Sequence, residues 1–315
     1  MIIGSKDVND LNEFKSSLSE RFKMKDLGVI KYFLGIEFEH DKVNNSITMG
    51  QHMYVERILL RFGLADCSSK GIPCTPGINK ELCDKSKVFD DTRLYREMVG
   101  SLIYVMMGTR PDLCYAVTLL SQHMAKPTLA HLNLCKQVYR YLKGTISYNM
   151  TYCKTKDDLN LTGFSDSDWG ASPDGKSTSG YCFSLDNRGP LIAWRSCKQR
   201  VVALSSCEAE YIALTDAMKE GNFLRQLLAD MTGSELKVVK LYADNQGAIA
   251  LSKNPVHRKR SRHINIRYHF IRQNVDEGIV KLEYIPTAKN IADMFTKPLP
   301  KSKLTEFACI RGAKV

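Results

Sequence analysis

The sequence predicts a mixed α/β protein in which a sheet covered by helices follows a smaller α+β region. Three observations point to this fold class. Apolar stripes at helical spacing run from residue 93 to 143, three strand-like runs follow between residues 159 and 195, and helical and strand-like segments alternate from residue 205 onward. Strands in series followed by alternating helices and strands are typical of a mixed sheet with helices on its faces.

The first ninety residues contain helical and strand-like patterns. Residues 1 to about 26 are predicted to form one amphipathic helix, because Leu11, Phe14, Leu18 and Phe22 recur at helical spacing. The alternating runs at 30–38 and 46–49 then predict a β-hairpin. A helix is expected from about residue 52 to 62, and a loop rich in Cys, Ser, Pro and Gly from there to residue 79.

The later elements follow from the same periodicities and from stop signals such as Gly144. In the middle of the chain we expect helices at 95–107, 111–124 and 128–142, followed by a polar connector at 151–158. The second half is predicted to contain strands at 159–164, 180–185 and 191–195, a long helix at 205–231, a strand at 236–242 with a helix directly after it, a basic helix at about 262–276, a strand at 279–285 and a final helix at 290–296. With 315 residues the chain is expected to form two domains, possibly three, and the second begins after the polar connector.

The charge distribution indicates a polyanionic partner. The net charge is +11, and no acidic residue lies between Asp244 and Asp276. That gap contains the basic residues Lys253, Arg258, Lys259, Arg260, Arg262, Arg267 and Arg272. A basic block can simply be a solvated face or a targeting signal, but beside carboxylates of the kind that bind metals it favours contact with a phosphate backbone. No apolar run is long enough to cross a membrane.

Asp244 is the first candidate for a metal ligand. It follows the apolar strand that ends at Tyr242, and Asn245 behind it can cap the next helix. A carboxylate held rigidly at the end of a strand suits a hard divalent cation. Taken alone, an aspartate after a strand is more often a cap or turn residue.

Other carboxylates stand in comparable positions. Asp166 and Asp168 alternate at the end of a strand and can face the same site. Glu208 and Glu210 lie in the first turns of the long helix, where two residues apart they point in different directions. Asp293 is embedded among apolar residues, which is costly without a compensating partner such as a metal. The choice between Asp166 and Asp168, and that between Glu208 and Glu210, stay open.

The order of these motifs resembles the ribonuclease H domain of reverse-transcribing elements. Over roughly residues 159 to 307, the sequence motifs are similar to those of the copia-type branch of the LTR retrotransposons. These motifs are SDSDWG, KSTSGYCF, SSCEAEYIAL, YADNQGAI, HINIRYHFIR and IPTAKNIADMFTKPL. Upstream, KDLGVIKYFLGIEF, YREMVGSLIYVMMGTRPDLCYAV and HLNLCKQVYRYLKGT resemble the C-terminal part of the same polyprotein's reverse transcriptase. The resemblance thus covers the whole chain.

The resemblance implies a ribonuclease H-like domain at 159–307, preceded by a palm or thumb remainder at 1–90 and a helical connecting region at 91–150. By position it assigns catalysis and metal binding to Asp166, Glu210, Asp244 and Asp293. They would hold two Mg²⁺ ions, with Mn²⁺ as an alternative, and cleave the RNA strand of an RNA–DNA hybrid. The nucleic-acid contacts would come from Arg258, Lys259, Arg260, Arg262, Arg267 and Arg272.

The resemblance also sets limits and an alternative. The loop before Asp293 has no histidine, although many ribonucleases H carry one there. The paired-aspartate motif of polymerases falls before a segment like Met1–Gly4 in this family, so no DNA polymerase activity is expected. The remainder of the polyprotein is a further expected partner, and the expected location is intracellular, in a cytoplasmic virus-like particle or the nucleus. The alternative function is a non-catalytic nucleic-acid-binding remnant of a degenerate retrotransposon.

Overall fold

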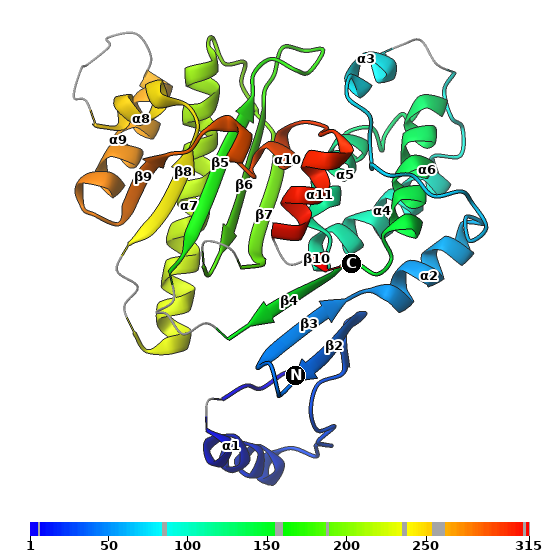
Figure 1. The fold of residues 1–315 in the computed structure, drawn as a ribbon, viewed down its shortest axis with the longest axis vertical. Coiled ribbons are helices and arrows are strands. Elements are labelled where there is room, and N and C mark those ends of the chain that lie inside the picture. The colour runs from blue at the N-terminus through cyan, green and yellow to red at the C-terminus, as the bar shows by residue number, and fades with distance from the viewer. Residues whose placement is uncertain are drawn as a thin grey trace.

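The structure is a computed structural model, and it describes residues 1–5, 7–83, 87–154, 160–186, 189–234, 238–253, 262–310 and 313–314. Its described strands form two five-stranded sheets, and helices flank both of them (Figure 1). The predicted mixed α/β class is confirmed. Among the described residues, no helix combines the length and the apolar character that crossing a membrane requires.

The larger sheet carries the second half of the chain. Its strand order is β7 (Leu191–Lys198), β6 (Thr178–Ser184), β5 (Thr162–Asp168), β8 (Val239–Ala243) and β9 (Val280–Tyr284). The first three strands pair antiparallel as a meander, whereas β8 and β9 run parallel to β5. This is the predicted arrangement. The first strand begins and ends later than expected, so that Asp166 and Asp168 lie within β5.

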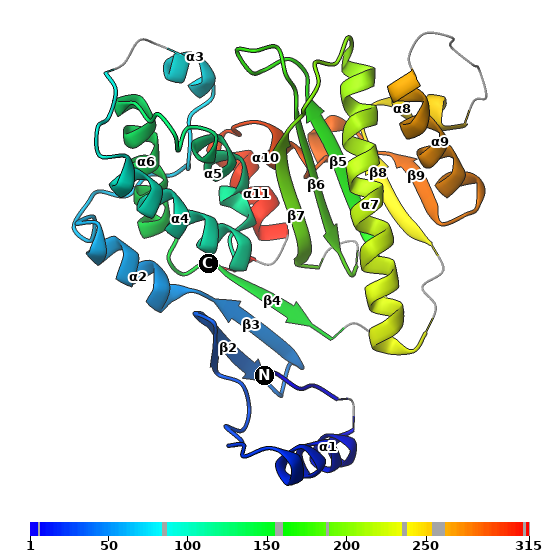
Figure 2. The same ribbon diagram turned by 180° about the vertical axis from the view of Figure 1, so that it is seen from behind.

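One face of this sheet is covered by α7 (Ser206–Thr232), with α8 (Gln246–Lys253) and α9 (Arg262–Asp276) beside it (Figure 2). Helix α7 begins where the Ser205 hydroxyl accepts a hydrogen bond from the Glu208 backbone N–H at 3.2 Å. It ends at Gly233, which adopts the left-handed conformation with φ 64°. Tyr181 and Phe183 point from β6 into the core beneath α7.

The opposite face packs on the helices of the middle region. These are α4 (Thr92–Gly108), α5 (Cys114–Ser121) and α6 (Leu129–Gly144), joined by the short α10 (Asp293–Thr296) and by α11 (Lys301–Ile310). Phe164 and Cys182 face this side, because successive strand residues alternate between faces. One hydrophobic core therefore runs from α2 (His52–Arg61) to α11. The helix predicted at 290–296 is shorter, at Asp293–Thr296, and it is not the final one, because α11 follows Pro298 and Pro300.

A buried ion pair fixes the turn between α4 and α5. Arg110 donates to both carboxylate oxygens of Asp112, at 3.0 and 2.7 Å, and to the backbone carbonyl oxygen of Thr145 at 3.1 Å. The Tyr141 hydroxyl donates to Asp112 Oδ2 at 2.8 Å. Arg110 and Asp112 are both almost fully buried, so the network replaces their lost hydration and ties the turn to the end of α6.

The smaller sheet joins residues far apart in the sequence. Its order is β1 (Tyr32–Phe33), β2 (Ile36–Asp41), β3 (Ser46–Gly50), β4 (Asn149–Cys153) and β10 (Ala313–Lys314), and its pairs are antiparallel. The predicted hairpin is confirmed as β2 and β3. The polar connector expected at 151–158 is wrong as far as Cys153, because these residues pair with β3 in β4. Residues 155–159 lie outside the described residues.

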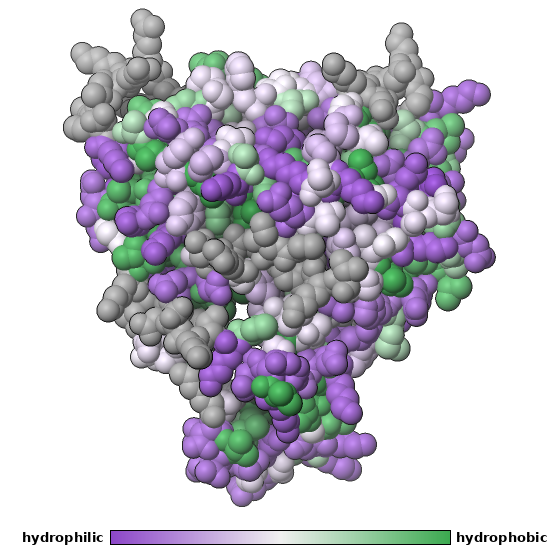
Figure 3. Space-filling model, viewed as in Figure 1, coloured by the Kyte–Doolittle hydropathy of each residue, from purple (hydrophilic) through white to green (hydrophobic). Residues whose placement is uncertain are grey.

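The N-terminal helix is shorter than predicted. Helix α1 spans Val8–Arg21, because the Asp7 carboxylate caps it through the Asn9 backbone N–H at 2.7 Å and Phe22 is already extended. No residue of α1 is buried. Figure 3 shows apolar surface at the lower tip of the molecule, where α1 lies. The loop expected between residues 62 and 79 leads into α3 (Ile78–Cys83).

Candidate functional site

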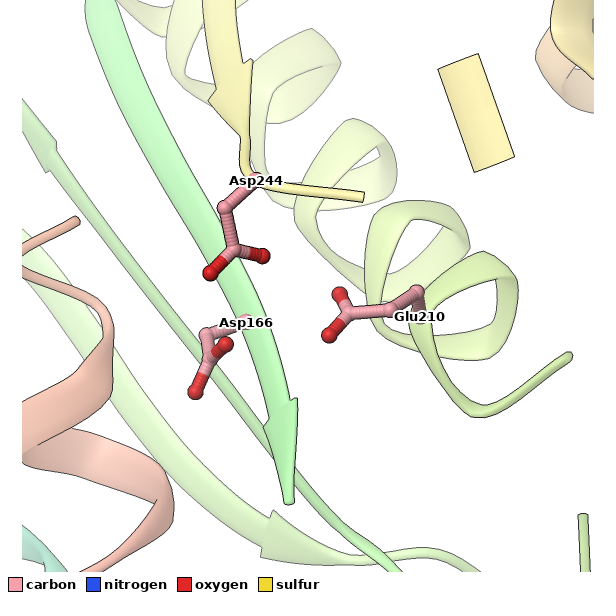
Figure 4. A group of neighbouring side chains, drawn as sticks. All are labelled: Asp166, Glu210 and Asp244. Carbon is pink, nitrogen blue, oxygen red and sulfur yellow. The ribbon is translucent and has the colours of Figure 1, made fainter. Parts of the chain in front are cut away.

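Three of the predicted carboxylates converge at one edge of the larger sheet. Asp166 lies in β5, Asp244 directly follows β8, and Glu210 reaches in from the second turn of α7 (Figure 4). Because β5 and β8 are parallel neighbours, their carboxyl ends meet at the same edge. One oxygen from each group lies within 4.8 Å of the other two. The site is therefore built from three elements that the core holds rigidly together.

Local sequence explains why each side chain points to this edge. Asn245 caps α8 as predicted, since its Oδ1 accepts from the Ala248 backbone N–H at 3.0 Å, and this leaves Asp244 in the turn. Glu208 completes the cap of α7, because its Oε2 accepts from the Leu204 backbone N–H at 2.8 Å. Glu210 instead faces β5, where its Oε1 accepts from the Ser167 backbone N–H at 3.2 Å.

The environment of the site disfavours negative charge in the metal-free protein. Burial raises the pKa of Glu210 to about 9, and the charges of Asp166 and Asp244 act in the same direction. Burial also raises the pKa of Asp166 to about 7, although Lys297 opposes the shift. Clustered carboxylates with raised pKa values are typical of functional sites, because an ordinary fold has no reason to bury them together.

The donor set fits a divalent cation. Glu210 is 5 % exposed, and its Oε2 has no hydrogen-bond partner within the described part of the chain. A buried carboxylate oxygen without a partner is costly unless something absent from the polypeptide compensates it. Three carboxylates offering hard oxygen ligands suit Mg²⁺ or Mn²⁺. A cation among Asp166, Glu210 and Asp244 accounts for this arrangement.

Asp168 is half-buried and does not join the three converging groups. Burial raises its pKa, and Lys297 and Asp293 are the charges that act on it. It points to the same face of β5 as Asp166, as the alternation predicts, but lies closer to the end of the strand. Of the alternatives Asp166 or Asp168 and Glu208 or Glu210, the structure places Asp166 and Glu210 in the cluster.

Asp293 lies beside the cluster and is engaged by lysines. It is fully buried in α10, where Lys297 Nζ lies 2.8 Å from its Oδ1 and Lys303 Nζ lies 2.6 Å from its Oδ2. The Lys297 ammonium is also 3.9 Å from Asp166 Oδ2. The buried carboxylate thus has two cationic partners from the polypeptide itself, which the sequence did not predict.

Two contacts hold α10 against the sheet. The Asn290 side-chain amide donates to the Ser165 backbone carbonyl at 3.0 Å, and the Thr296 hydroxyl donates to Asp166 Oδ2. Gly180 lies opposite Asp166 in the β5–β6 ladder. A Cβ at Gly180 would lie 2.7 Å from the Cβ of Phe295, so only glycine allows α10 to approach this closely.

The site extends beyond the predicted residues to Lys297, Lys303 and Thr296. Lys297 follows Asp293 by four residues and lies directly after the end of α10, where its backbone is extended. Lys303 could not be found from local spacing, because it belongs to the unpredicted α11. The segment before Asp293, which lacks the expected histidine, is a short 3₁₀ turn at Thr287–Lys289.

The basic segment is only partly described. The predicted nucleic-acid contacts Arg258, Lys259 and Arg260 lie outside the described residues. The predicted basic helix is confirmed as α9, and Arg262 begins it, although the Arg262 side chain is not described. Arg267 and Arg272 are half-buried on α9. Asn274 of the same helix bonds to Asn222 of α7 at 2.6 Å, which holds the basic helix on the face opposite α10.

Comparison with known proteins relates the chain to mobile elements. The reverse transcriptase (RNA-dependent DNA polymerase) family model matches residues 1–76. The retrovirus-related Pol polyprotein from transposon TNT 1-94 of Nicotiana tabacum is 36% identical over 309 residues, which cover 96% of this chain and 23% of that protein. The corresponding polyprotein from transposon RE1 of Arabidopsis thaliana is also 36% identical, over 98% of this chain and 21% of its own length.

The chain thus spans less than a quarter of the length of these two polyproteins. Among solved structures, LC11-RNase H1 in complex with RNA/DNA hybrid covers 44% of this chain and 94% of its own, with 18% identity and a TM-score of 0.33.

Proposed function

Because this chain belongs to the Pol polyproteins of copia-type retrotransposons, we propose that it is a metal-dependent ribonuclease H that cleaves the RNA strand of RNA–DNA hybrids. The observation that carries the proposal is the convergence of Asp166, Glu210 and Asp244 on one point from three elements. Their order along the chain is also the order of the motifs that resemble ribonuclease H domains.

The proposed roles follow from position and chemistry. Asp166, Glu210 and Asp244 are the ligands of a divalent cation, Mg²⁺ or Mn²⁺, and Asp166 and Glu210, whose pKa values are raised, lose their protons when they bind it. A cation in such a site supplies a Lewis acid that activates water and stabilises a leaving oxygen. Ser167 orients Glu210 through its backbone N–H, and Thr296 orients Asp166 through its hydroxyl. Asp293 holds Lys297 and Lys303 beside the acidic site by ion pairs.

The substrate is proposed from the partner chemistry. A ribose 2′-hydroxyl distinguishes the cleaved strand from DNA, and a positively charged surface is needed to hold the phosphates. The net charge of +11 and the basic residues from Arg258 to Arg272 support this assignment. The regions at 1–90 and 91–150 are proposed as reverse transcriptase and connecting segments, and 159–307 as the nuclease domain.

The test uses the full chain, because α4 to α6 share one core with the larger sheet and removing them would expose it. Hybrids labelled on either strand, duplex DNA, duplex RNA and single-stranded RNA are incubated with Mg²⁺ and with chelator. We expect cuts in the RNA strand of the hybrid, dependent on Mg²⁺ and absent from the DNA strand. Tight hybrid binding by a folded protein without any cleavage would instead support the non-catalytic alternative.

A further inference from the structure

Each oxygen of Asp293 lies within ion-pair distance of an ammonium group of this chain, and within the described residues only Oδ2 accepts a hydrogen bond. Lys297 Nζ lies 2.8 Å from Oδ1, Lys303 Nζ lies 2.6 Å from Oδ2, and the carboxylate itself is fully buried. Both lysine side chains are partly shielded, with exposures of 35% and 27%. Ion pairs to a carboxylate with no access to water are screened weakly, so a metal ion would have to displace them in order to bind Asp293.

Lys297 also reaches the metal cluster. Its ammonium lies 3.9 Å from Asp166 Oδ2, on the side of Asp166 that faces α10. It therefore stands between two carboxylates that come from different elements, one from β5 and one from α10. Lys297 thus places a positive charge beside both carboxylates. The hydrogen bond that the Thr296 hydroxyl donates to Asp166 Oδ2 closes the approach from α10 further.

The charges of the site agree with this arrangement. Four carboxylates, Asp166, Glu210, Asp244 and Asp293, carry four formal negative charges when ionised. Lys297 and Lys303 offset two of those charges, and one divalent cation offsets the other two; the half-buried Asp168 beside Lys297 adds one further carboxylate outside the cluster. A second divalent ion would add two positive charges beside Lys297 and Lys303, next to the fully buried Asp293.

We propose that Lys297 takes the place of a second metal ion, so that this site binds a single divalent cation at Asp166, Glu210 and Asp244. Asp293 is then the anchor of two lysines and contacts no metal. The inference rests on the proposed function, since it assigns roles within the same site. It differs from the two-ion arrangement that the sequence resemblance implies.

Calorimetric titration of the full chain with Mn²⁺ alone, without nucleic acid, tests this arrangement. We expect one Mn²⁺ per chain for the unaltered protein and two for Lys297→Met, because that variant removes the cation beside Asp293 Oδ1 and Asp166 while Lys303 stays on Asp293 Oδ2. Lys303→Met is the matched control, and it keeps one ion because Lys297 still holds its position. Circular dichroism and thermal unfolding establish that each variant is folded.

A second pair of variants gives the answer even where Lys297→Met does not fold. Asp293→Asn is expected to change the Mn²⁺ affinity by less than about threefold. Asp244→Asn is expected to lower it by at least about tenfold, because losing even a group that only supports a metal ligand lowers metal affinity by about 10- to 100-fold. Two ions on the unaltered protein, a single ion on folded Lys297→Met, or an equal loss in Asp293→Asn and Asp244→Asn would overturn the inference alone. Absence of any Mn²⁺ binding would overturn the proposed function together with it.

Discussion

The carboxyl group of Glu210 is tied to β5 by the backbone N–H of Ser167, which donates to Glu210 Oε1 at 3.2 Å. This contact joins the helix on one face of the sheet to the strand that carries Asp166. It leaves Glu210 Oε2 buried and without a hydrogen-bond partner within the described residues. The orientation of Glu210 is therefore fixed before any ligand binds, which is the preorganisation that a metal site requires.

The raised pKa values predict that the metal-free protein becomes less stable as the pH rises. Burial raises the pKa of Glu210 from 4.5 to about 9 and that of Asp166 from 3.8 to about 7. Between these limits the folded protein binds more protons than the unfolded chain, so its free energy of unfolding falls with increasing pH. The contribution of these two carboxyl groups to the unfolding free energy is fully present below about pH 4 and is lost progressively up to about pH 9.

Glu210→Gln is expected to remove much of this loss. At pH 8 with chelator the variant should have an unfolding free energy at least about 1 kcal/mol higher than the unaltered protein, since one pKa unit corresponds to about 1.4 kcal/mol. It should therefore unfold at a higher temperature. Glu208→Gln is the control, because the amide oxygen of the introduced glutamine can still accept from the Leu204 backbone N–H. Equal unfolding temperatures for the two variants at pH 8 would contradict the account.

Metal binding should strengthen as the pH rises. A cation that binds Asp166, Glu210 and Asp244 must displace the protons that the raised pKa values retain on Asp166 and Glu210. The Mg²⁺ affinity is expected to rise by up to about tenfold per pH unit for each displaced proton. Thermal unfolding at graded Mg²⁺ concentrations between pH 6 and pH 8 measures this. An affinity that stays constant over that range would show that these carboxylates are not the ligands.

The close approach of α10 to the sheet predicts a large cost for a side chain at Gly180. A Cβ there would lie 2.7 Å from the Phe295 Cβ and 3.1 Å from the Ala292 backbone carbonyl oxygen. Gly180→Ala is expected to lower the unfolding free energy by about 1–3 kcal/mol, as overpacking does. It should also weaken Mn²⁺ binding, because Gly180 lies opposite Asp166 in the ladder.

Gly100→Ala provides the comparison for Gly180→Ala. Gly100 is exposed on α4, and nothing lies within 4 Å of the position that its Cβ would take. An alanine in the interior of a helix is more favourable than glycine, so this variant should gain about 0.5–1 kcal/mol. If thermal unfolding showed that both substitutions stabilise the protein, α10 would not pack on β6 as described.

The buried pair of Arg110 and Asp112 predicts a strong asymmetry between two arginine variants. Arg110→Met leaves the Asp112 carboxylate buried without its cation and is expected to cost about 3–5 kcal/mol. Arg93→Met removes a side chain that is 90% exposed and pairs with Glu97 on the surface, so it should change the stability by less than about 1 kcal/mol. Thermal unfolding of both variants measures the difference, and similar losses would contradict the assigned burial.

Much of the site could be predicted because strand and helix periods fix the direction of side chains. Alternation along β5 put Asp166 and Asp168 on one face, and the strand before Asp244 put that residue at the sheet edge. The choice of Glu210 over Glu208 was also available, because Ser205 followed three residues later by Glu208 is a sequence signature of a helix start; in the structure Glu208 accepts from the Leu204 backbone N–H, one residue before the cap. In that motif Glu208 is used to close the helix.

Other features depend on tertiary contacts that no local pattern reports. Strand β4 pairs with β3, about a hundred residues earlier, and a run of five residues carries too little local pattern to be assigned to a strand without its partner. Lys303 reaches Asp293 from α11, which follows two prolines. The ion pairs of Asp293 with Lys297 and Lys303 follow from the packing of α10 and α11, and the contact with Lys303 could not be predicted from spacing.

The most direct test of the central claim compares Glu210→Gln with Glu208→Gln in cleavage of the RNA–DNA hybrid with Mg²⁺. The two residues lie two positions apart on one helix, but Glu210 belongs to the cluster and Glu208 caps the helix. We expect Glu210→Gln to lose at least about 100-fold in cleavage rate, since a metal site contributes several kcal/mol to the transition state. Glu208→Gln should stay within about threefold of the unaltered protein. Equal activity of the two variants, or none in the unaltered protein, would contradict the account.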